Sequence, residues 1–346
     1  MTNSKSQLRP IKTSTLLALA AALALAAPAA GAQTAAHTAA QTAAQAAYPT
    51  RVIQLVVPFP PGAGTDALAR MVAPALGDAL GGKVVVENKV GAAGNIGTEA
   101  VARALPDGHT LLLGGIWLAV NPSLFKSMPY DPKKDFTSIA LLANQPLTLV
   151  VNPGVKANSV KELVALAKSE PGKLTYGSAG IGNQPHLLAE LFVRATGINV
   201  VHVPYKGAGA ALNDVIAGHV TLLFLGPSST KPHIDAGKVR GLAITGTERF
   251  AALPNLPTFD EVGFPIREFD NGSWWGLNAP AATPPAILER LNAAANKALQ
   301  DPTTRERLIG VGFTPRGGTP AVYDRVIQSE TATWSRLIQS AGIKPE

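Results

Sequence analysis

From residue 48 onward, short β-branched runs alternate with longer segments whose apolar residues recur every three or four positions. Residues 52–58 form the first apolar run, and the apolar positions of 68–80 follow with helical spacing. Further apolar runs come at 84–86 and 111–113, with a glycine-led helical stretch between them. This strand–helix order predicts a parallel sheet with helices on its faces.

The same order returns between residues 174 and 245. Strands are predicted at 174–176, 200–203, 220–225 and 239–245. The helices between them are expected to end before Gly197 and at Ile216. Two α/β lobes with matching internal order predict a cleft between them.

The C-terminal part departs from this rhythm, with one predicted strand at 274–278 followed only by helices. These helices are expected near 284–300, 303–310 and 319–341. We interpret the chain as crossing between lobes at 144–147 and returning at 265–275. The predicted fold class is therefore α/β with two lobes, each a mainly parallel sheet with flanking helices. The first lobe would comprise residues 48–146 and 270–346, and the second lobe 147–269.

The first 47 residues have a different composition. A basic start is followed by an almost pure Leu and Ala run over 15–30, and Ala30-Gly31-Ala32 fits a cleavage site. These features predict a secretory signal peptide over residues 1–32 and export to the periplasm. A membrane anchor is the alternative, although the run is short for a span of about 20 residues. Residues 33–47 have almost no large apolar side chains, so we expect a disordered leader.

Charge and cysteine content exclude or disfavour several classes of function. The formal net charge is +7, and removing the three basic residues of the predicted signal leaves 27 basic against 23 acidic residues, or +4. That excess suits an anionic solute, and no Lys/Arg-rich tract with interleaved aromatics favours a nucleic-acid partner. The sequence has no cysteine, which excludes disulfides, iron–sulfur clusters, thiol catalysis and a lipid-modified cysteine.

A glycine-rich loop follows a predicted strand in each lobe, at residues 59–66 and 177–186. In open α/β sheets, ligands bind where strands end and helices begin. The free N–H groups of a helix N-terminus suit an anion, and glycine lets the backbone approach it closely. We therefore expect the two loops to hold a carboxylate-bearing molecule between the lobes.

Five side chains lie near these loops or near the predicted return crossing, and several of them are open to two interpretations. Asp66 either caps the following helix, in competition with Thr65, or contacts a donor group of the ligand. His186 is expected early in its helix and half-buried. Trp117 either walls the ligand site or packs between the lobes. Of Trp274 and its neighbour Trp275, at most one should face the cleft, because adjacent strand residues point in opposite directions.

The sequence shows no catalytic or cofactor motif. Its six histidines lack metal-ligand spacing, and no G-x-S-x-G elbow surrounds a serine. Neither glycine loop ends in the Lys-Ser/Thr of a phosphate-binding loop. We expect no enzymatic activity, no metal and no cofactor. The alternative from another class is a secreted α/β enzyme that acts on a small anionic substrate.

Several segments, in order, resemble the substrate-binding proteins of tripartite tricarboxylate transporters, the TctC or Bug receptors. They are residues 59–70, 84–89, 94–97, 106–112, 176–186, 203–207 and 253–258. The resemblance extends over residues 48–346. It implies a periplasmic Venus-flytrap fold of the type II binding-protein kind. Such receptors hold carboxylates, or in some members a neutral amide, through backbone amides and waters of the two glycine loops.

The resemblance and the pattern together give one set of candidate ligand-binding residues. They are Phe59, Gly62, Ala63, Gly64, Thr65, Asp66, Trp117, Ser178, Ala179, Gly180, Gly182, Asn183 and His186. The resemblance also implies partners, one large and one small integral-membrane permease subunit, and we expect the receptor to be a monomer. A ligand sensor for a signalling partner is a variant of this function. Gly62-Ala63-Gly64 and Ile181 depart from the usual family pattern, which leaves the ligand's identity open.

Overall fold

The computed structural model describes residues 48–62, 64–270 and 272–340. The predicted signal peptide and leader, together with Ala63, lie outside the described residues. The described residues from Arg51 onward form one compact unit, and both sheets belong to it.

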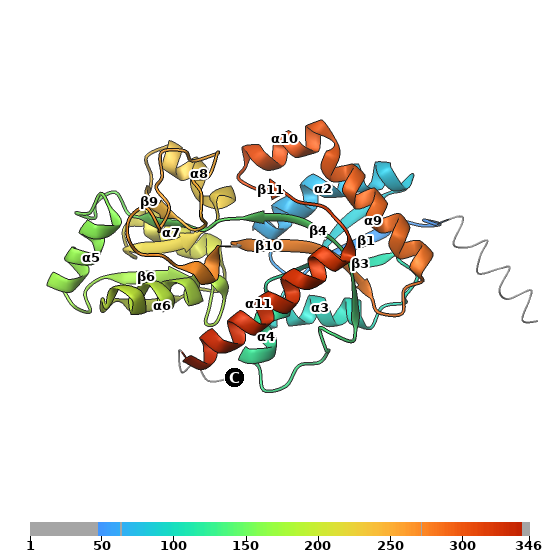
Figure 1. Cartoon of the computed structure of the whole chain (residues 1–346), viewed down its shortest axis with the longest axis horizontal. Coiled ribbons are helices and arrows are strands. Elements are labelled where there is room, and N and C mark those ends of the chain that lie inside the picture. Colours follow the sequence, from blue (N-terminus) through green and yellow to red (C-terminus); the bar gives the residue numbers. More distant parts are fainter. Residues whose placement is uncertain (1–47, 63, 271, 341–346) are drawn as a thin grey trace, which may run out of the picture. The chain divides into compact units, whose positions relative to one another are not determined.

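The first sheet has six strands in the order β11-β4-β10-β3-β1-β2 (Figure 1). Their bounds are β1 Ile53–Val57, β2 Val84–Asn88, β3 Thr110–Gly115, β4 Phe136–Gln145, β10 Ser273–Pro280 and β11 Thr314–Pro315. β1 pairs in parallel with β2 and β3, as helix-linked strands should. β10 pairs antiparallel with β3 and β4, and β11 with β4. The sheet is therefore mixed and not mainly parallel as predicted, because β10 and β11 come from the returning C-terminal part of the chain and pair antiparallel.

Helices cover both faces of this sheet, which buries their apolar stripes. α2 (Gly64–Leu80), α9 (Pro285–Gln300) and α10 (Pro302–Gly310) pack together on one face. The short helix η1 (Ala92–Gly94), α3 (Asn95–Ala102), α4 (Trp117–Leu124) and α11 (Pro320–Ser340) lie on the other (Figure 1). In α2 the buried positions include Leu68, Val72 and Leu76, the spacing predicted from the sequence.

The second sheet has five strands in the order β7-β6-β8-β5-β9. Their bounds are β5 Thr148–Val151, β6 Thr175–Ser178, β7 Val201–Pro204, β8 Leu222–Leu225 and β9 Arg240–Ile244. β6 pairs in parallel with β7 and β8, whereas β5 runs antiparallel to β8 and β9. The flanking helices are α5 Val160–Ser169, α6 Gln184–Thr196, α7 Ala208–Ala217 and α8 Pro227–Asp235.

Strand β8 shows how this sheet is buried on both sides. Leu222 and Phe224 belong to one apolar cluster, which also contains Phe192 of α6. Leu223 belongs to a second cluster with Val215 of α7. Successive side chains of a strand point to opposite faces, so an uninterrupted apolar run fits a strand that has helices on both sides.

Two central strands, β4 and β10, connect the chain between the two sheets, and one long helix, α11, packs against both lobes. β4 of the first sheet leads into β5 of the second, and the return passes through a short helix, η2 (Arg267–Phe269), into β10. Helix α11 ends beside α6, where Arg194 Nη2 donates to the Ser340 carbonyl at 2.5 Å. Trp334 of α11 packs edge-on against Phe269 with 4.8 Å between ring centroids. These contacts tie α11 to both lobes.

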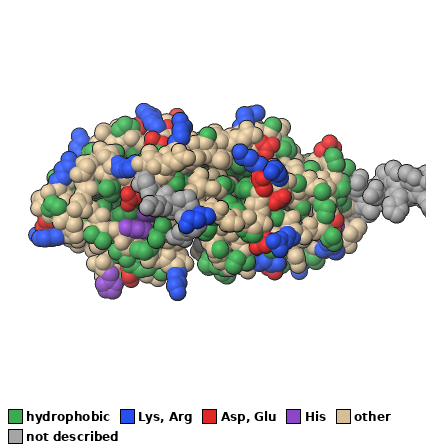
Figure 2. Space-filling view, turned by 90° about the horizontal axis from the view of Figure 1, so that it is seen from below, with side chains coloured by type: hydrophobic (Ala, Val, Ile, Leu, Met, Phe, Trp, Pro, Cys, Tyr) green, Lys and Arg blue, Asp and Glu red, His purple; other side chains and the backbone are tan. Residues whose placement is uncertain are grey.

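The surface carries dispersed charge. In the face shown in Figure 2, Lys and Arg side chains are spread over the surface singly and in small groups, and several lie near acidic ones. Such a distribution forms no continuous basic band on that face. Within the described part of the chain, no helix combines the length and apolar character needed to cross a membrane.

Candidate functional site

Among the strands whose ends lead into helices are β1 into α2, β3 into α4, β6 into α6 and β8 into α8. Strand β10 runs antiparallel to β3 and β4, so its start lies at their ends. Trp275 pairs with Gly115 at the end of β3, and Ser273 pairs with Gln145 at the end of β4. This edge of the first sheet therefore gathers the glycine loop 59–66 with polar residues of the connecting strands. Open α/β sheets bind their ligands at such an edge.

The first glycine loop is held in shape by the carboxylate of Asp66, which is 3% exposed in the first turn of α2. Asp66 Oδ2 accepts from Gly62 N at 3.0 Å and from Arg70 Nε at 2.9 Å. Asp66 Oδ1 accepts from Asn88 Nδ2 at 2.9 Å, and Asn88 also donates to the Phe59 carbonyl at 2.9 Å. Both carboxylate oxygens are thus engaged in hydrogen bonds inside the first lobe, and the backbone donor is Gly62 of the loop that precedes α2.

Burial by itself would raise the pKa of Asp66, but hydrogen bonds from Arg70, Gly62 and Asn88 stabilise the carboxylate and lower the pKa below its usual value. A carboxyl whose pKa is lower in the folded state stabilises the fold above its unfolded pKa. That stability is lost as the pH falls through the lowered folded pKa.

Asp66→Ala is expected to lower the free energy of unfolding by about 1–3 kcal/mol, because it leaves three hydrogen-bond donors without their acceptor. Thermal unfolding at pH 7 should show a melting temperature lower by several degrees. The difference from wild type should shrink below about pH 4, where the carboxyl of the unfolded chain begins to take up a proton. Asp78→Ala, at an exposed position of the same helix, is the matched control. An equal effect of both substitutions would contradict the view that Asp66 holds the first glycine loop in shape.

Two aromatic side chains pack beside the first loop. Phe59 is half-buried and meets Trp117 edge-on, with 4.8 Å between ring centroids. The indole N–H of Trp117 donates to Thr98 Oγ1 at 3.2 Å, and Trp117 is only 6% exposed. Trp117 begins α4 and fills the space beside Gly115, where an added Cβ would lie 2.3 Å from its ring. The observed contacts of Trp117 are therefore packing contacts.

The tryptophan pair of β10 faces two directions and both rings are buried, Trp274 at 1% and Trp275 at 6% exposure. Trp274 packs edge-on against Tyr323 of α11. Trp275 packs against Phe313, and its indole N–H donates to Thr65 Oγ1 at 3.0 Å. Thr65 thus anchors α2 to the central strand.

In the second loop, Ser178 is fully buried at the end of β6. Its hydroxyl donates to the Gly180 carbonyl at 2.9 Å and accepts from Gly180 N at 3.2 Å. The same oxygen lies 2.7 Å from His202 Nε2. The side chain of Ser178 is therefore occupied in folding the loop, and Ala179 beside it is half-buried.

Asn183 and His186 complete the loop. Asn183 Oδ1 caps α6 by accepting from His186 N at 3.1 Å, and Asn183 Nδ2 donates to the Gly180 carbonyl at 2.6 Å. Gly182 N donates to His186 Nδ1 at 3.0 Å. Gly180 and Gly182 have φ values of +128° and +74°, a region that favours glycine. His186 is buried at 7% exposure, deeper than the half-buried position predicted for it.

The two lobes come close to each other around Gly64. A Cβ added to Gly64 would lie 3.2 Å from Ser228 Oγ of α8 and 3.7 Å from Gln145 Nε2 of β4. Ser228 N donates weakly to Gln145 Oε1 at 3.4 Å. The first glycine loop, a connecting strand and the N-terminus of α8 thus meet at one point.

The buried polar atoms that have no hydrogen-bond partner among the described residues include Ser228 Oγ at this junction, Gln184 Nε2 at the start of α6 and Thr148 Oγ1 at the start of β5. Gln184 opens α6, and its Oε1 accepts from Ser273 Oγ. Buried polar atoms without partners are costly, so these atoms are suited to bind a polar group that enters between the lobes.

Gln145, Gln184 and Ser228 were not predicted from the sequence. The segment Gly226-Pro227-Ser228 carried a signal, because a glycine and a proline directly after an apolar run are typical of a strand end that opens a helix. Nothing local marks Gln145, whose place at the junction depends on the pairing of β4 with β10.

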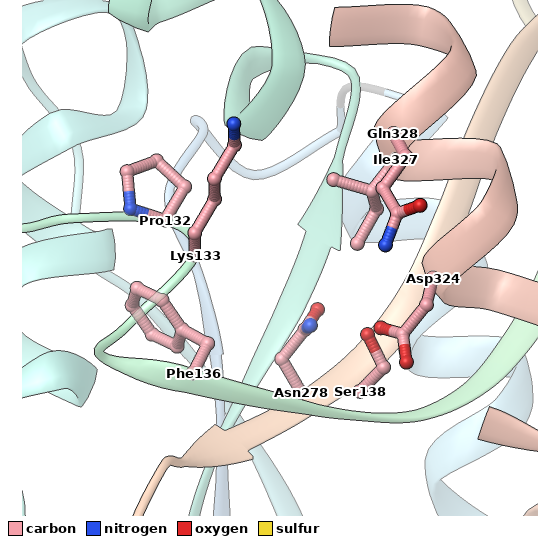
Figure 3. Close-up of a pocket in the computed structure, with 8 residues that line it drawn as sticks. All are labelled: Pro132, Lys133, Phe136, Ser138, Asn278, Asp324, Ile327 and Gln328. Atoms are coloured by element: carbon pink, nitrogen blue, oxygen red, sulfur yellow. The ribbon is translucent and has the colours of Figure 1, made fainter. Parts of the chain in front are cut away.

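A separate hollow of about 250 Å³ lies in the first lobe, between α11 and the strands β4 and β10 (Figure 3). Its lining comprises Pro132, Lys133, Phe136, Ser138, Asn278, Asp324, Ile327 and Gln328. Asn278 pairs with Leu112, toward the start of β3, and Phe136 begins β4. The hollow therefore lies at the opposite sheet edge from the glycine loops.

Comparison with known proteins places this architecture in a family. A family model described as the tripartite tricarboxylate transporter family receptor matches residues 68–343. The chain belongs to this receptor family. The protein BugT of Bordetella pertussis (strain Tohama I) is 40% identical over 299 residues, which cover 86% of this chain and 91% of BugT.

Solved structures of receptors share the fold. The periplasmic binding protein BugD is 36% identical with a TM-score of 0.80 over 86% of this chain and 100% of BugD. Rpa4515 of R. palustris, with adipate, is 35% identical with a TM-score of 0.81 over 86% of this chain and 100% of Rpa4515. MatC (Rpa3494) of Rhodopseudomonas palustris, with bound malate, is 32% identical with a TM-score of 0.76 over 84% and 100%.

These matches confirm the predicted family and the two-lobed type II binding-protein fold. The protein is a solute-binding receptor of the tripartite tricarboxylate transporter family, and this family consists of periplasmic binding proteins. In the described part of this receptor, no group of three or more His, Asp or Glu side chains is arranged to hold a metal ion.

Proposed function

We propose that this receptor captures a small aliphatic carboxylate between its two lobes and delivers it, unaltered, to the large and small membrane subunits of a tripartite transporter. It would act in the periplasm as a monomer, after removal of residues 1–32. The first lobe would comprise residues 48–146 and 270–346, and the second lobe 147–269. The observation that carries the proposal is the meeting of Gly64, Gln145 and Ser228, where polar groups from both lobes converge.

The chemistry of this junction suits a carboxylate. Ser228 can donate its hydroxyl proton and Gln184 its amide protons, while a carboxylate oxygen accepts both. Helices α2 and α8 begin beside the junction, and helix N-termini favour anions. Two relatives hold adipate and malate in their solved structures, which supports acyclic dicarboxylates of this size as the first candidates.

A ligand screen tests the proposal. Purified receptor, unfolded and refolded to remove carried-over solute, would be tested by thermal shift with malate, adipate, citrate, glutamate, benzoate and nicotinamide. A ligand at 100 times its Kd should add about 2.7 kcal/mol and raise the melting temperature by several degrees. Calorimetry should then count one ligand per chain. No shift with any of the acids would contradict the carboxylate assignment.

Ser228→Ala is expected to weaken binding of the best acid from that screen about three- to tenfold, the value of one hydrogen bond of about 1 kcal/mol. The ligand-free melting temperature should stay unchanged, because the hydroxyl has no partner among the described residues that the substitution would remove. Titration calorimetry measures both variants. Ser229→Ala on the same helix should bind as wild type, and equal weakening by both would remove Ser228 from the site.

A further inference from the structure

The second glycine loop rests on a stack of three rings. His202 of β7 lies between Tyr176 of β6 and His186 of α6, with centroid distances of 4.7 Å to Tyr176 and 4.2 Å to His186. The ring planes are within 14° and 22° of parallel. The stack is anchored at one end, where the Tyr176 hydroxyl donates to Glu190 Oε1.

Each histidine holds one side of the loop through a ring nitrogen. His186 Nδ1 accepts a hydrogen bond from Gly182 N at 3.0 Å, so this nitrogen carries no proton. The proton of the neutral ring is then on Nε2, which lies 4.0 Å from Glu190 Oε1. Protonation of His186 would place a hydrogen on Nδ1 against the N–H of Gly182 and break that contact.

His202 holds the start of the loop. Its Nε2 lies 2.7 Å from Ser178 Oγ, the hydroxyl that also bonds both polar backbone atoms of Gly180. If both histidines were protonated, the charged ring of His202 would stack on the charged ring of His186, with only 4.2 Å between centroids. The two cations would repel each other inside a largely buried site.

We propose that His186 and His202 are positioning residues that hold loop 177–186 in its ligand-binding shape only while both imidazole rings are neutral, so that acidification releases the solute. This inference rests on the proposed function of the loop. Neither histidine needs to touch the ligand, because each acts through Gly182 or Ser178.

The surroundings favour the neutral rings. Burial lowers the pKa of His186, opposed by Glu190. Burial and then the neighbouring His186 lower the pKa of His202 to about 4, again opposed by Glu190. Among the described residues, the titratable groups that face the pair are Glu190 of α6 and Tyr176 of β6. A histidine held neutral in the fold costs stability as the pH falls below about 6.5, the value of a free histidine. The pH window of the effect is therefore roughly 6.5 down to 4.

The loop's response to protonation can be measured without any ligand. Imidazole and backbone NMR resonances of the intact receptor would be followed from pH 8 to pH 3.5. The amide resonance of Gly182 is expected to move together with the titration of His186. A Gly182 resonance that stays in place while His186 titrates would overturn the proposal, as would two histidines that remain neutral throughout.

Binding provides the second readout. Kd for malate and for adipate would be measured from pH 8 to pH 5 in wild type and in His186→Asn/His202→Gln. The amides do not titrate, and they can replace the accepting nitrogen of His186 and the donating N–H of His202. For each acid, the ratio of the wild-type Kd to the variant Kd at the same pH cancels the titration of the acid itself. The affinity of wild type for each acid should fall about tenfold relative to that of the variant between pH 8 and pH 5. A ratio that is constant with pH would overturn the proposal.

Two controls separate the possible failures. His219→Gln changes an exposed histidine of the same lobe, whose side chain is 72% exposed, and should keep the pH profile of wild type. If neither acid binds wild type at pH 8, the carboxylate assignment fails and the NMR titration alone decides the role of the histidines. If the double variant does not fold, the Gly182 resonance of wild type still gives the answer.

Discussion

Gly64→Val is expected to weaken solute binding tenfold to 100-fold while each lobe stays folded. The Cβ alone would lie 3.2 Å from Ser228 Oγ, tighter than ordinary contact, and the two methyl groups of valine extend further toward Ser228 and Gln145. Overpacking of this kind costs about 1–3 kcal/mol, which here opposes the approach of α8 to the first loop. Each 1.4 kcal/mol changes the affinity tenfold.

Gly209→Val is the matched control for this prediction. Gly209 also lies in the first turn of a helix, α7, and a Cβ added there has no neighbour within 4 Å. It should bind solute as wild type does, with a similar small cost of placing valine in a helix. Small-angle scattering with saturating solute should show the Gly64→Val receptor more open than wild type. Wild-type affinity in Gly64→Val would show that the solute site is not at this junction.

Trp334→Ala is expected to have the largest effect on stability. Trp334 is fully buried in α11, its indole N–H donates to Glu330 Oε2 at 2.8 Å, and its ring packs on Phe269. Truncating a buried tryptophan costs about 3–5 kcal/mol, and it would also leave the buried Glu330 without this donor. Thermal or urea unfolding should show a melting temperature lower by roughly 10 °C or more.

Gln339→Ala, at an exposed position near the end of the same helix, should change stability by less than about 0.5 kcal/mol. Because Trp334 joins α11 to the returning segment at Phe269, its loss should also loosen the passage between the lobes. A melting temperature of Trp334→Ala within one degree of wild type would contradict the view that α11 ties the two lobes together.

The sequence by itself determined the elements whose apolar periodicity and flanking glycine residues predict the same boundaries. The apolar spacing of 68–80 and the glycine pair after it correspond to α2, and the runs at 84–86 and 111–113 correspond to β2 and β3. The three C-terminal helices also lie where the pattern predicted them. Helix α5 was not predicted, although Ser159 and Glu162 form a capping pair that the sequence displays. Helices α4 and α8 contain Pro122 and Pro232, which obscure a helical pattern.

Tertiary structure decided what the candidate side chains do. Asp66 accepts hydrogen bonds from Gly62 and Asn88, and Ser178 contacts His202. These partners lie up to 24 residues away, and no local sequence pattern predicts them. The junction of Gly64, Gln145 and Ser228 requires β4 and β10 to pair and α8 to reach the first loop. Periodicity reports which face of an element is buried, because burial repeats with the turn of a helix or the pleat of a strand. It carries no information on which distant element covers that face, so the sequence located the loops and only the fold showed which of their atoms remain available to a solute.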